Sequence, residues 1–258
     1  MTRTVASERT TAEYARGALF GLAAVSIWAA NIVVAGLGLR SNLTPWDISA
    51  VRFAVAGLVL VPYLMRRGLA LDRLGWIGLV ALVLGGAPTV LLANAGLLFA
   101  PASHAGALFP GVMPLMVAVL AAAILKEAFT RQKRVGFALI ATGVVGIVWG
   151  SGGTIGTAQN IGHLLFLGSA LAFACYTVAM RRARLDGLHA AAISAVGSML
   201  IYMPPYAIMA GPGIFDASPS AIALQALVQG LLTAVISYIV YGVAVSYTHL
   251  TLPTNREV

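Results

Sequence analysis

Residues 74 to 125 read "LGWIGLVALVLGGAPTVLLANAGLLFAPASHAGALFPGVMPLMVAVLAAAIL" and contain no Asp, Glu, Lys or Arg. A helix needs about 20 consecutive apolar residues to cross the hydrocarbon core of a bilayer, which is roughly 30 Å thick. The stretch is therefore long enough for two crossings. Pro101 lies near its middle, where we expect one helix to end and the next to begin. The stretch decides the fold class, because it predicts transmembrane helices.

The composition of the whole chain agrees with a membrane protein. Hydrophobic residues make up 60% of the chain and charged residues only 9%, against roughly 25% charged in soluble domains. The net charge of +8 would also suit a nucleic-acid-binding protein, but the basic residues form short clusters between apolar runs, so we expect no nucleic-acid partner. The single cysteine, Cys175, excludes an intrachain disulfide and a Cys-rich metal site. We predict no metal site and no bound cofactor.

The apolar pattern predicts an all-α, polytopic transmembrane helical bundle with eight spans. A second stretch without charged residues covers 135 to 180, and the Gly/Ser/Thr-rich "SGGTIGTAQN" at 151 to 160 interrupts it. The first apolar run, 17 to 39, is longer than the core of a signal peptide, about 7 to 15 residues, so we expect it to be a retained span. The predicted spans cover residues 17–39, 46–65, 74–99, 102–125, 135–150, 160–180, 188–210 and 220–246.

Basic residues alternate between successive loops and predict the orientation. Short cytoplasmic loops collect Lys and Arg, and the loops on the opposite side contain only Arg40. We therefore expect residues 1–16 to be a cytoplasmic N-terminus, in a multi-pass protein of the inner (plasma) membrane. The basic clusters before span one and after spans two, four and six are Arg3, Arg9 and Arg16; Arg66, Arg67 and Arg73; Lys126, Arg131, Lys133 and Arg134; and Arg181, Arg182 and Arg184.

The chain shows signs of an internal duplication. "ISAV" occurs at 48–51 and again 145 positions later at 193–196. "ALVLG" at 81–85 matches "ALVQG" at 226–230 with the same offset. A constant offset over successive spans indicates a repeat.

The repeating unit would contain five spans, and five is odd. The second unit must then enter the membrane from the opposite side, which makes the repeats inverted. We predict a first five-helix repeat at 17–150 and a second, incomplete repeat at 160–246 with three of its five helices. Inverted repeats are typical of secondary transporters, which bind substrate near the bilayer midplane.

Several segments resemble the first unit of the EamA-type transporters in the drug/metabolite transporter superfamily. They are "SIWAANIVVAGLGL", "DISAVRFAVAGLVLVPYL" and "SHAGALFPGVMPLMVAVLAAAILKEAFT", which carry Trp28, Asn31, Arg52, Pro114 and Glu127 in the family's order. The resemblance covers residues 17 to about 245 and implies ten helices in two five-helix units and export of small metabolites. Two features depart from the pattern: His104 stands where the family usually has a small residue, and the second unit stops early.

The end of the chain does not continue the apolar pattern. Residues 247–258 form a polar tail that resembles read-through of a sequencing adapter and looks non-native. The duplication predicts a natural gene of about 295 residues with ten spans, of which eight are present here. The chain is therefore interpreted as C-terminally truncated, and we expect it to insert but not to transport.

Polar and aromatic residues inside the spans are the candidates for substrate binding. Arg52 would attract an anionic group, or its side chain would extend outward towards Asp47. His104 would carry a proton during transport, since an ordinary histidine titrates near pH 6.5, or it is a solvated loop residue. The amides would line a wet cavity or join helices, and the aromatic residues would line the cavity or pack the core. The predicted substrate-binding residues are Trp28, Asn31, Arg52, Asn94, His104, Tyr176, Gln229 and Tyr238.

These observations favour a secondary transporter that exports a small polar or amphipathic metabolite, either amino-acid-like or drug-like, by alternating access. A passive channel and a non-transporting scaffold stay open as alternatives, and an intramembrane hydrolase is less favoured because GxSxG and HExxH motifs are absent. We therefore predict no enzymatic activity. The expected partners are the small-molecule substrate and the lipid bilayer, with protons as one candidate for the driving ion and a homodimer as an open arrangement.

Overall fold

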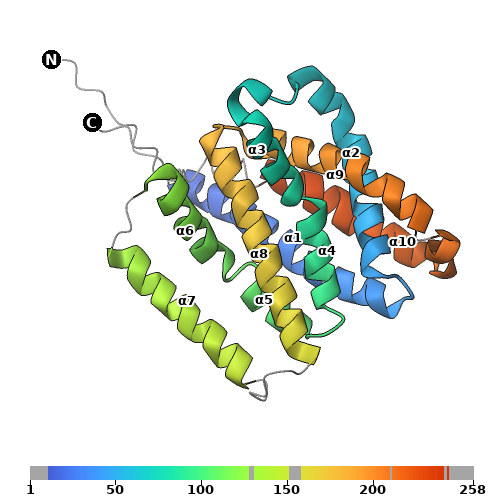
Figure 1. Ribbon diagram of the computed structural model, residues 1–258, viewed down its shortest axis with the longest axis horizontal. Helices are drawn as coiled ribbons and strands as arrows, with labels where there is room; N and C mark the ends of the chain where they lie inside the picture. The colour runs from blue at the N-terminus through green and yellow to red at the C-terminus, as the bar shows by residue number, and fades with distance from the viewer. Residues whose placement is uncertain (1–10, 128–130, 151–157, 210, 241–242, 244–258) are drawn as a thin grey trace.

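The computed structural model describes residues 11–127, 131–150, 158–209, 211–240 and 243, and within these ranges it contains helices and no strand (Figure 1). The part of the chain predicted as the first repeat contains α1 to α7, and the part predicted as the second contains α8 to η2. The helices are α1 (Thr11–Arg40), α2 (Pro45–Arg67), α3 (Leu71–Leu84), α4 (Ala87–Gly96), α5 (Ala102–Leu108), α6 (Met113–Leu125), α7 (Arg131–Gly150), α8 (Ala158–Arg182), α9 (Gly187–Met209), the 3₁₀ helix η1 (Gly211–Asp216), α10 (Pro219–Gln225) and the π-helix η2 (Ala226–Ile236).

Seven helical segments in the described ranges are long and apolar enough to cross a membrane: Ala15–Arg40, Pro45–Arg67, Leu71–Gly96, Ala102–Leu125, Ala158–Arg182, Gly187–Met209 and Pro219–Val240. Each corresponds to one predicted span. The remaining predicted span, 135–150, falls in α7, whose apolar part Arg134–Ile147 is shorter because the helix opens with polar and basic residues. The predicted tail at 247–258 lies outside the described residues.

The start of α2 shows how the sequence fixes a helix end. The Thr44 hydroxyl accepts a hydrogen bond from the Asp47 backbone N–H at 3.2 Å, and the Thr44 N–H donates to the Asp47 carboxylate at 2.7 Å. This reciprocal pair satisfies two backbone donors that a helix end otherwise leaves free. Pro45 follows at the first helical position, where its missing N–H costs nothing. The helix ends before Gly68, whose φ of 72° lies in the region that favours glycine.

Three of the long segments are broken near their middles. Gly85 and Gly86 separate α3 from α4, and a short non-helical stretch around Pro110 separates α5 from α6. In the last segment, α10 passes directly into the π-helix η2. Breaks of this kind leave backbone groups without their usual helical partners, so they persist where neighbouring side chains supply new ones. At the first break, the Ser198 hydroxyl on α9 accepts the Ala87 N–H at 2.9 Å.

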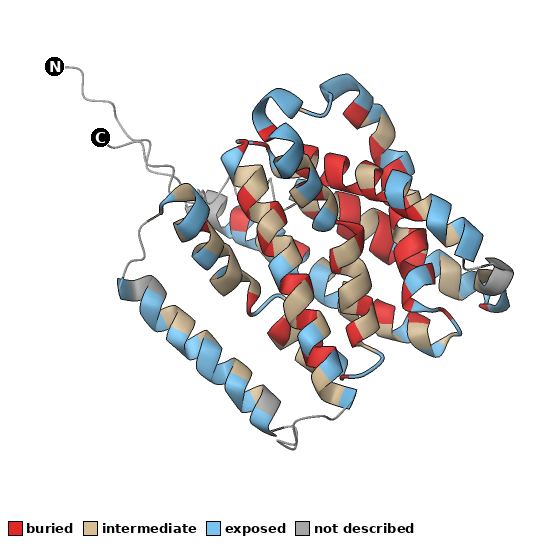
Figure 2. Ribbon diagram, in the orientation of Figure 1, coloured by how far each residue is buried: buried red, intermediate tan, exposed pale blue. Residues whose placement is uncertain are grey.

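The helices pack so that segments distant in sequence form the core. The α2 helix packs along α9, the broken α3–α4 segment packs along α8, and α1 packs along η2 and α10. Buried residues concentrate on α2, α8, α9 and η2 (Figure 2). The α7 helix lies at the edge of the bundle, and large apolar side chains on it are exposed, Trp149 by 77% and Leu139 by 70%. Large exposed apolar side chains such as these are expected on helices that contact lipid.

Candidate functional site

A cavity of about 180 Å³ lies among all seven long segments. Its walls combine a few polar groups with many apolar and aromatic side chains, as is usual for small-molecule sites. The breaks at Gly85–Gly86 and at Pro110 both border it, as does η2. The lining residues are Trp28, Asn31, Ile32, Arg52, Phe53, Gly85, Gly86, Thr89, Val90, Ala93, Asn94, Phe109, Pro110, Met113, Phe173, Tyr176, Ala191, Ser194, Ala195, Gln229, Thr233, Ala234 and Tyr238.

Arg52 is the charged residue of this cavity, and neutral amides hold its side chain. Its Nη1 donates to the Asn31 Oδ1 at 3.3 Å and to the Gln229 Oε1 at 3.1 Å. The ion pairs found in the described part of the chain are Arg73–Asp72 and Arg181–Glu127, so the guanidinium has no carboxylate partner there. Placing an unpaired Arg in a membrane costs about 2.5 to 3.5 kcal/mol near a helix centre. A charge kept at this cost is a candidate for function.

The alternative interpretation of Arg52, an extension towards Asp47, does not agree with the structure. The Asp47 carboxylate is occupied by Thr44 and by the hydroxyl of Tyr206. Arg52 lies seven residues after the start of α2, about 10 Å along the helix at 1.5 Å per residue. Asp47 and Arg52 are five residues apart, about one and a half turns, and the guanidinium reaches sideways to α1 and η2 instead.

Amides fix the relative positions of the helices around Arg52. The Gln229 Nε2 donates to the Asn31 carbonyl at 3.2 Å, and the neighbouring Gln225 Nε2 donates to the Val34 carbonyl at 2.7 Å. The Asn94 Nδ2, which also lines the cavity, donates to the Ser49 hydroxyl at 3.4 Å. Polar contacts of this kind join helices in lipid, where each is worth about 0.6 to 2 kcal/mol. The sequence left open whether the amides join helices or line the cavity. Asn31, Asn94 and Gln229 do both.

Two of the non-α segments that border the cavity satisfy their backbones in the same way. The Thr89 hydroxyl donates to the Leu84 carbonyl across the first break, at 3.2 Å. The Thr233 hydroxyl donates to the Val228 carbonyl within η2, at 2.7 Å. In both cases the acceptor lies five residues earlier, which is the spacing of a π-helical turn. Stable local deviations from the α-helix at these two places give the cavity its shape.

Glycines at the break allow neighbouring helices to come close. A Cβ atom at Gly85 would overlap the Tyr176 side chain of α8, and one at Gly86 would overlap the hydroxyls of Ser198 and Ser194 on α9. The side chain of Tyr176 is buried, with 3% of its surface exposed. Close contact at this point therefore requires residues without side chains.

Seven of the eight predicted substrate-binding residues line this one cavity: Trp28, Asn31, Arg52, Asn94, Tyr176, Gln229 and Tyr238. Their placement is a structural finding, and their part in binding stays a prediction. Trp28 is held by a hydrogen bond from its Nε1 to the Ser237 hydroxyl at 3.0 Å.

His104, the eighth predicted residue, lies elsewhere. Its Nδ1 is 3.0 Å from the Nε2 of His163 on α8 and 3.3 Å from the Nε2 of Gln159. The sequence grouped His104 with the binding residues because it opens a span, but in the structure His104, at the start of α5, contacts the first turns of α8 and does not line the cavity. It is thus neither a cavity residue nor a solvated loop histidine.

The sequence missed several lining residues, notably the hydroxyl residues Thr89, Ser194 and Thr233 and the aromatic residues Phe109 and Phe173. Hydroxyl and aromatic residues are frequent in membrane helices, so their presence alone carries little signal. The break at Gly85–Gly86 followed by Pro88 was a usable signal for Thr89. Within the described residues, no group of three or more His, Cys, Asp or Glu side chains could hold a metal ion.

Comparison with known proteins identifies the family. A model of the "EamA-like transporter family" matches residues 15–149, slightly more than half of the chain. No curated protein matches the chain significantly. A solved structure titled "Crystal structure of protein" is similar, with 19% sequence identity and a TM-score of 0.49 over 93% of this chain and 89% of the other. The chain therefore belongs to the EamA-like transporter family and is a multi-pass membrane protein of a transporter family.

Proposed function

We propose that the protein is a secondary transporter that exports a small polar or amphipathic metabolite across the inner membrane by alternating access. The observation that carries the proposal is the cavity around Arg52, which is enclosed by segments from both halves of the chain. A mid-membrane cavity with one charge and mostly apolar walls suits a small solute better than it suits a structural role.

The helix pairing supports the inverted repeat on which alternating access depends. The 145-residue offset relates α1 to α8, α2 to α9, and the broken α3–α4 segment to α10–η2. When each element is exchanged for its related one, the α1–η2 contact becomes the contact of α8 with α3–α4. The α2–α9 contact is unchanged, because α2 and α9 are related to each other. Such a pattern is expected when two similar units pack around a pseudo-two-fold axis in the membrane plane.

The broken helices support the same interpretation. Gly85, at the break of α3–α4, is related by the offset to Gly230, which lies within η2. The two related segments thus depart from α-helical geometry at equivalent places, and both border the cavity. Discontinuous helices in corresponding positions of two repeats are where transporters bind substrate. Movement of one unit against the other would open the cavity to each side in turn.

Transport by inverted membrane vesicles tests the proposal. The vesicles would come from cells that express the intact gene, with the 258-residue chain in parallel, and a panel of labelled metabolites would be offered at their outer face. We expect saturable uptake of at least one compound, accelerated when the vesicles are preloaded with the same compound unlabelled. Uptake that never saturates and is not accelerated would indicate a channel. Flux no greater than that of empty vesicles for every compound would show the proposal to be wrong.

A further inference from the structure

The charge balance of the cavity narrows the class of substrate. Arg52 brings one positive charge, and none of the described residues that line the cavity is Asp or Glu. Its two partners, Asn31 and Gln229, are neutral. Because a charge in a low-dielectric site interacts strongly with any ion that enters, the cavity selects for one negative charge.

The hydrogen bonds of Arg52 leave one edge of its guanidinium group free. Both bonds are made by Nη1, whereas Nε is buried and has no partner. Nη2 forms no hydrogen bond either within the described ranges. The N–H groups of Nε and Nη2 point in the same direction and form the fork that binds both oxygens of a carboxylate. The amides thus hold the group from one side and leave the donors of its bidentate edge without a partner.

The cavity offers an ammonium group no comparable partner. No carboxylate lines it in the described part of the chain, and the carbonyls of Leu84 and Val228 at the non-α segments already accept the hydroxyls of Thr89 and Thr233. A zwitterion would therefore meet only neutral acceptors, such as the Tyr176 hydroxyl, at its cationic end inside the membrane. Desolvation of an unpaired charge is expensive, so an amino acid is a worse fit than an acid without the amino group.

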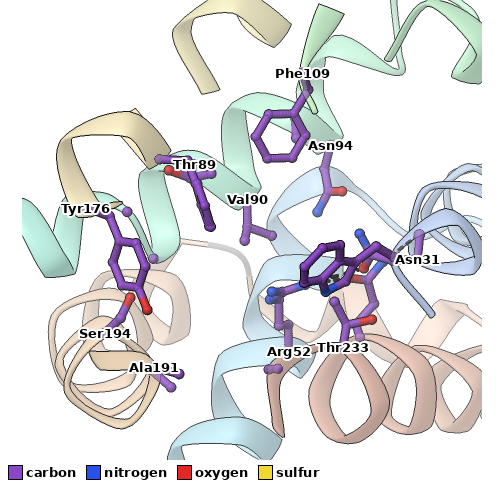
Figure 3. Close-up of a pocket in the computed structure, with 18 of the residues that line it drawn as sticks. Asn31, Arg52, Thr89, Val90, Asn94, Phe109, Tyr176, Ala191, Ser194 and Thr233 are labelled. Carbon is purple, nitrogen blue, oxygen red and sulfur yellow. Dashed lines mark hydrogen bonds between the residues drawn. The ribbon is translucent and has the colours of Figure 1, made fainter. Parts of the chain in front are cut away.

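The far side of the cavity suits an apolar body. Asn31, Arg52 and Thr233 lie together on one side of the view, and Phe109 lies across the cavity from them, with the Asn94 amide beside it (Figure 3). Phe109 meets Phe173 edge to face, with ring centroids 6.3 Å apart at 80°. The volume of about 180 Å³ is below the roughly 300 to 1,000 Å³ of sites for drug-sized ligands. An aryl group or a short branched alkyl group would fill the space.

We infer that the cavity binds an amphipathic monocarboxylate, with its carboxylate on the Nε–Nη2 edge of Arg52 and its apolar body against Phe109 and Phe173. The inference rests on the proposed function only in taking this cavity as the substrate site. A phosphate monoester would bring a second negative charge that no lining residue pairs, and a cation would be repelled by Arg52.

Equilibrium binding to the purified 258-residue chain in lipid nanodiscs tests the inference without requiring transport. The ligands are 3-phenylpropanoate and 4-methylpentanoate, each compared with its uncharged amide, together with phenylalanine, phenyl phosphate and phenethylamine. Charged hydrogen bonds are stronger than neutral ones, so we expect at least one carboxylate to bind about tenfold or more tightly than its amide. It should also bind more tightly than the zwitterion, the dianion and the cation.

Two variants locate the effect. Arg52→Gln should reduce binding of the carboxylate to that of the amide, and Arg52→Lys should restore only part of it, because lysine keeps the charge but lacks the fork. Arg182→Gln, which removes an exposed positive charge at the end of α8, is the matched control and should bind like the unaltered chain. The comparison of carboxylate with amide on the unaltered chain stands even if an Arg52 variant does not fold.

Equal binding of each acid and its amide, no binding of any of them at millimolar concentration, or tighter binding of the zwitterion would overturn the inference. Saturable vesicle transport of a zwitterion or a cation, without carboxylate binding, would leave the proposed function intact. Only the inference that the substrate is a monocarboxylate would then be wrong. Carboxylate binding without transport of any compound would support the monocarboxylate site and count against the proposed transport function.

Discussion

The Nη1 atom of Arg52 on α2 lies 3.1 Å from the Oε1 of Gln229 on η2, although 177 positions separate the two residues in sequence. The bond joins the two halves of the chain at the cavity. It places a neutral acceptor where an ion pair would be expected, so the charge of Arg52 stays available to a ligand.

Replacing Arg52 should impair transport more than assembly. For Arg52→Ala in a form of the protein that shows transport, we expect uptake per inserted molecule to fall at least about tenfold, because a charged hydrogen bond contributes about 1.5 to 3 kcal/mol. The amount of inserted protein, measured by immunoblot of washed membranes, should fall much less. Equal losses of both quantities would make Arg52 a structural residue.

The substitution Gln229→Glu should weaken ligand binding, because the new carboxylate would compete with the ligand for Arg52. The substitution preserves shape and puts a carboxylate 3.1 Å from Nη1, where it would pair with Arg52 and compensate its charge. We expect insertion to be unaffected and binding of a monocarboxylate to weaken by about tenfold or more, as measured in nanodiscs.

The control for this change is Gln225→Glu, one helical turn earlier. Gln225 does not line the cavity, and its Nε2 donates to the Val34 carbonyl at 2.7 Å. A carboxylate there loses the donor and faces the carbonyl, so this variant should lower the melting temperature. If Gln229→Glu behaved in the same way, by lowering stability without weakening binding, the assigned position of the Arg52 charge would be wrong.

Gly86→Ala should disturb the break between α3 and α4. The added methyl group would overlap the Ser198 hydroxyl, which also accepts the Ala87 N–H. Overpacking of this kind costs typically about 1 to 3 kcal/mol, and thermal unfolding in detergent should register it. At Gly36 on α1 no atom lies within 4 Å of the added Cβ, so Gly36→Ala should leave stability unchanged or raise it slightly. Similar effects at both sites would argue against close packing at the break.

His104 and His163 should be energetically coupled. Their ring nitrogens are 3.0 Å apart, and the contact joins the start of α5 to α8. In a double-mutant cycle with alanine at each position, we expect a coupling free energy of about 0.5 to 3 kcal/mol, measured by chemical unfolding. His189, which contacts the Gly68 carbonyl instead, provides the comparison: His104→Ala and His189→Ala should be additive. Additivity in both pairs would mean that the His104–His163 contact contributes nothing.

The sequence by itself determined the membrane class, seven of the segments that are long enough to cross, and the family. Runs without charge have few alternatives to a transmembrane helix, because each ionised group in lipid is costly. Gly85, Gly86 and Pro88 in one apolar run also favour a break, since glycine weakens a helix and proline lacks the N–H that continues it. The fifth predicted span, 135–150, is not among the seven, because α7 begins with several polar residues and its apolar part is short. The inverted repeat and the direction of export stay predictions.

Only the tertiary structure decided which polar residues meet. Apolar periodicity says which face of a helix is polar, but the partner of that face depends on how the helices pack. The packing turned Arg52 towards Asn31 and Gln229 rather than Asp47, and it turned His104 to His163 rather than to the cavity. Thr233 could not be recognised beforehand, because its importance comes from the π-helical backbone around it, and that geometry depends on long-range contacts of η2 with α1 and α2.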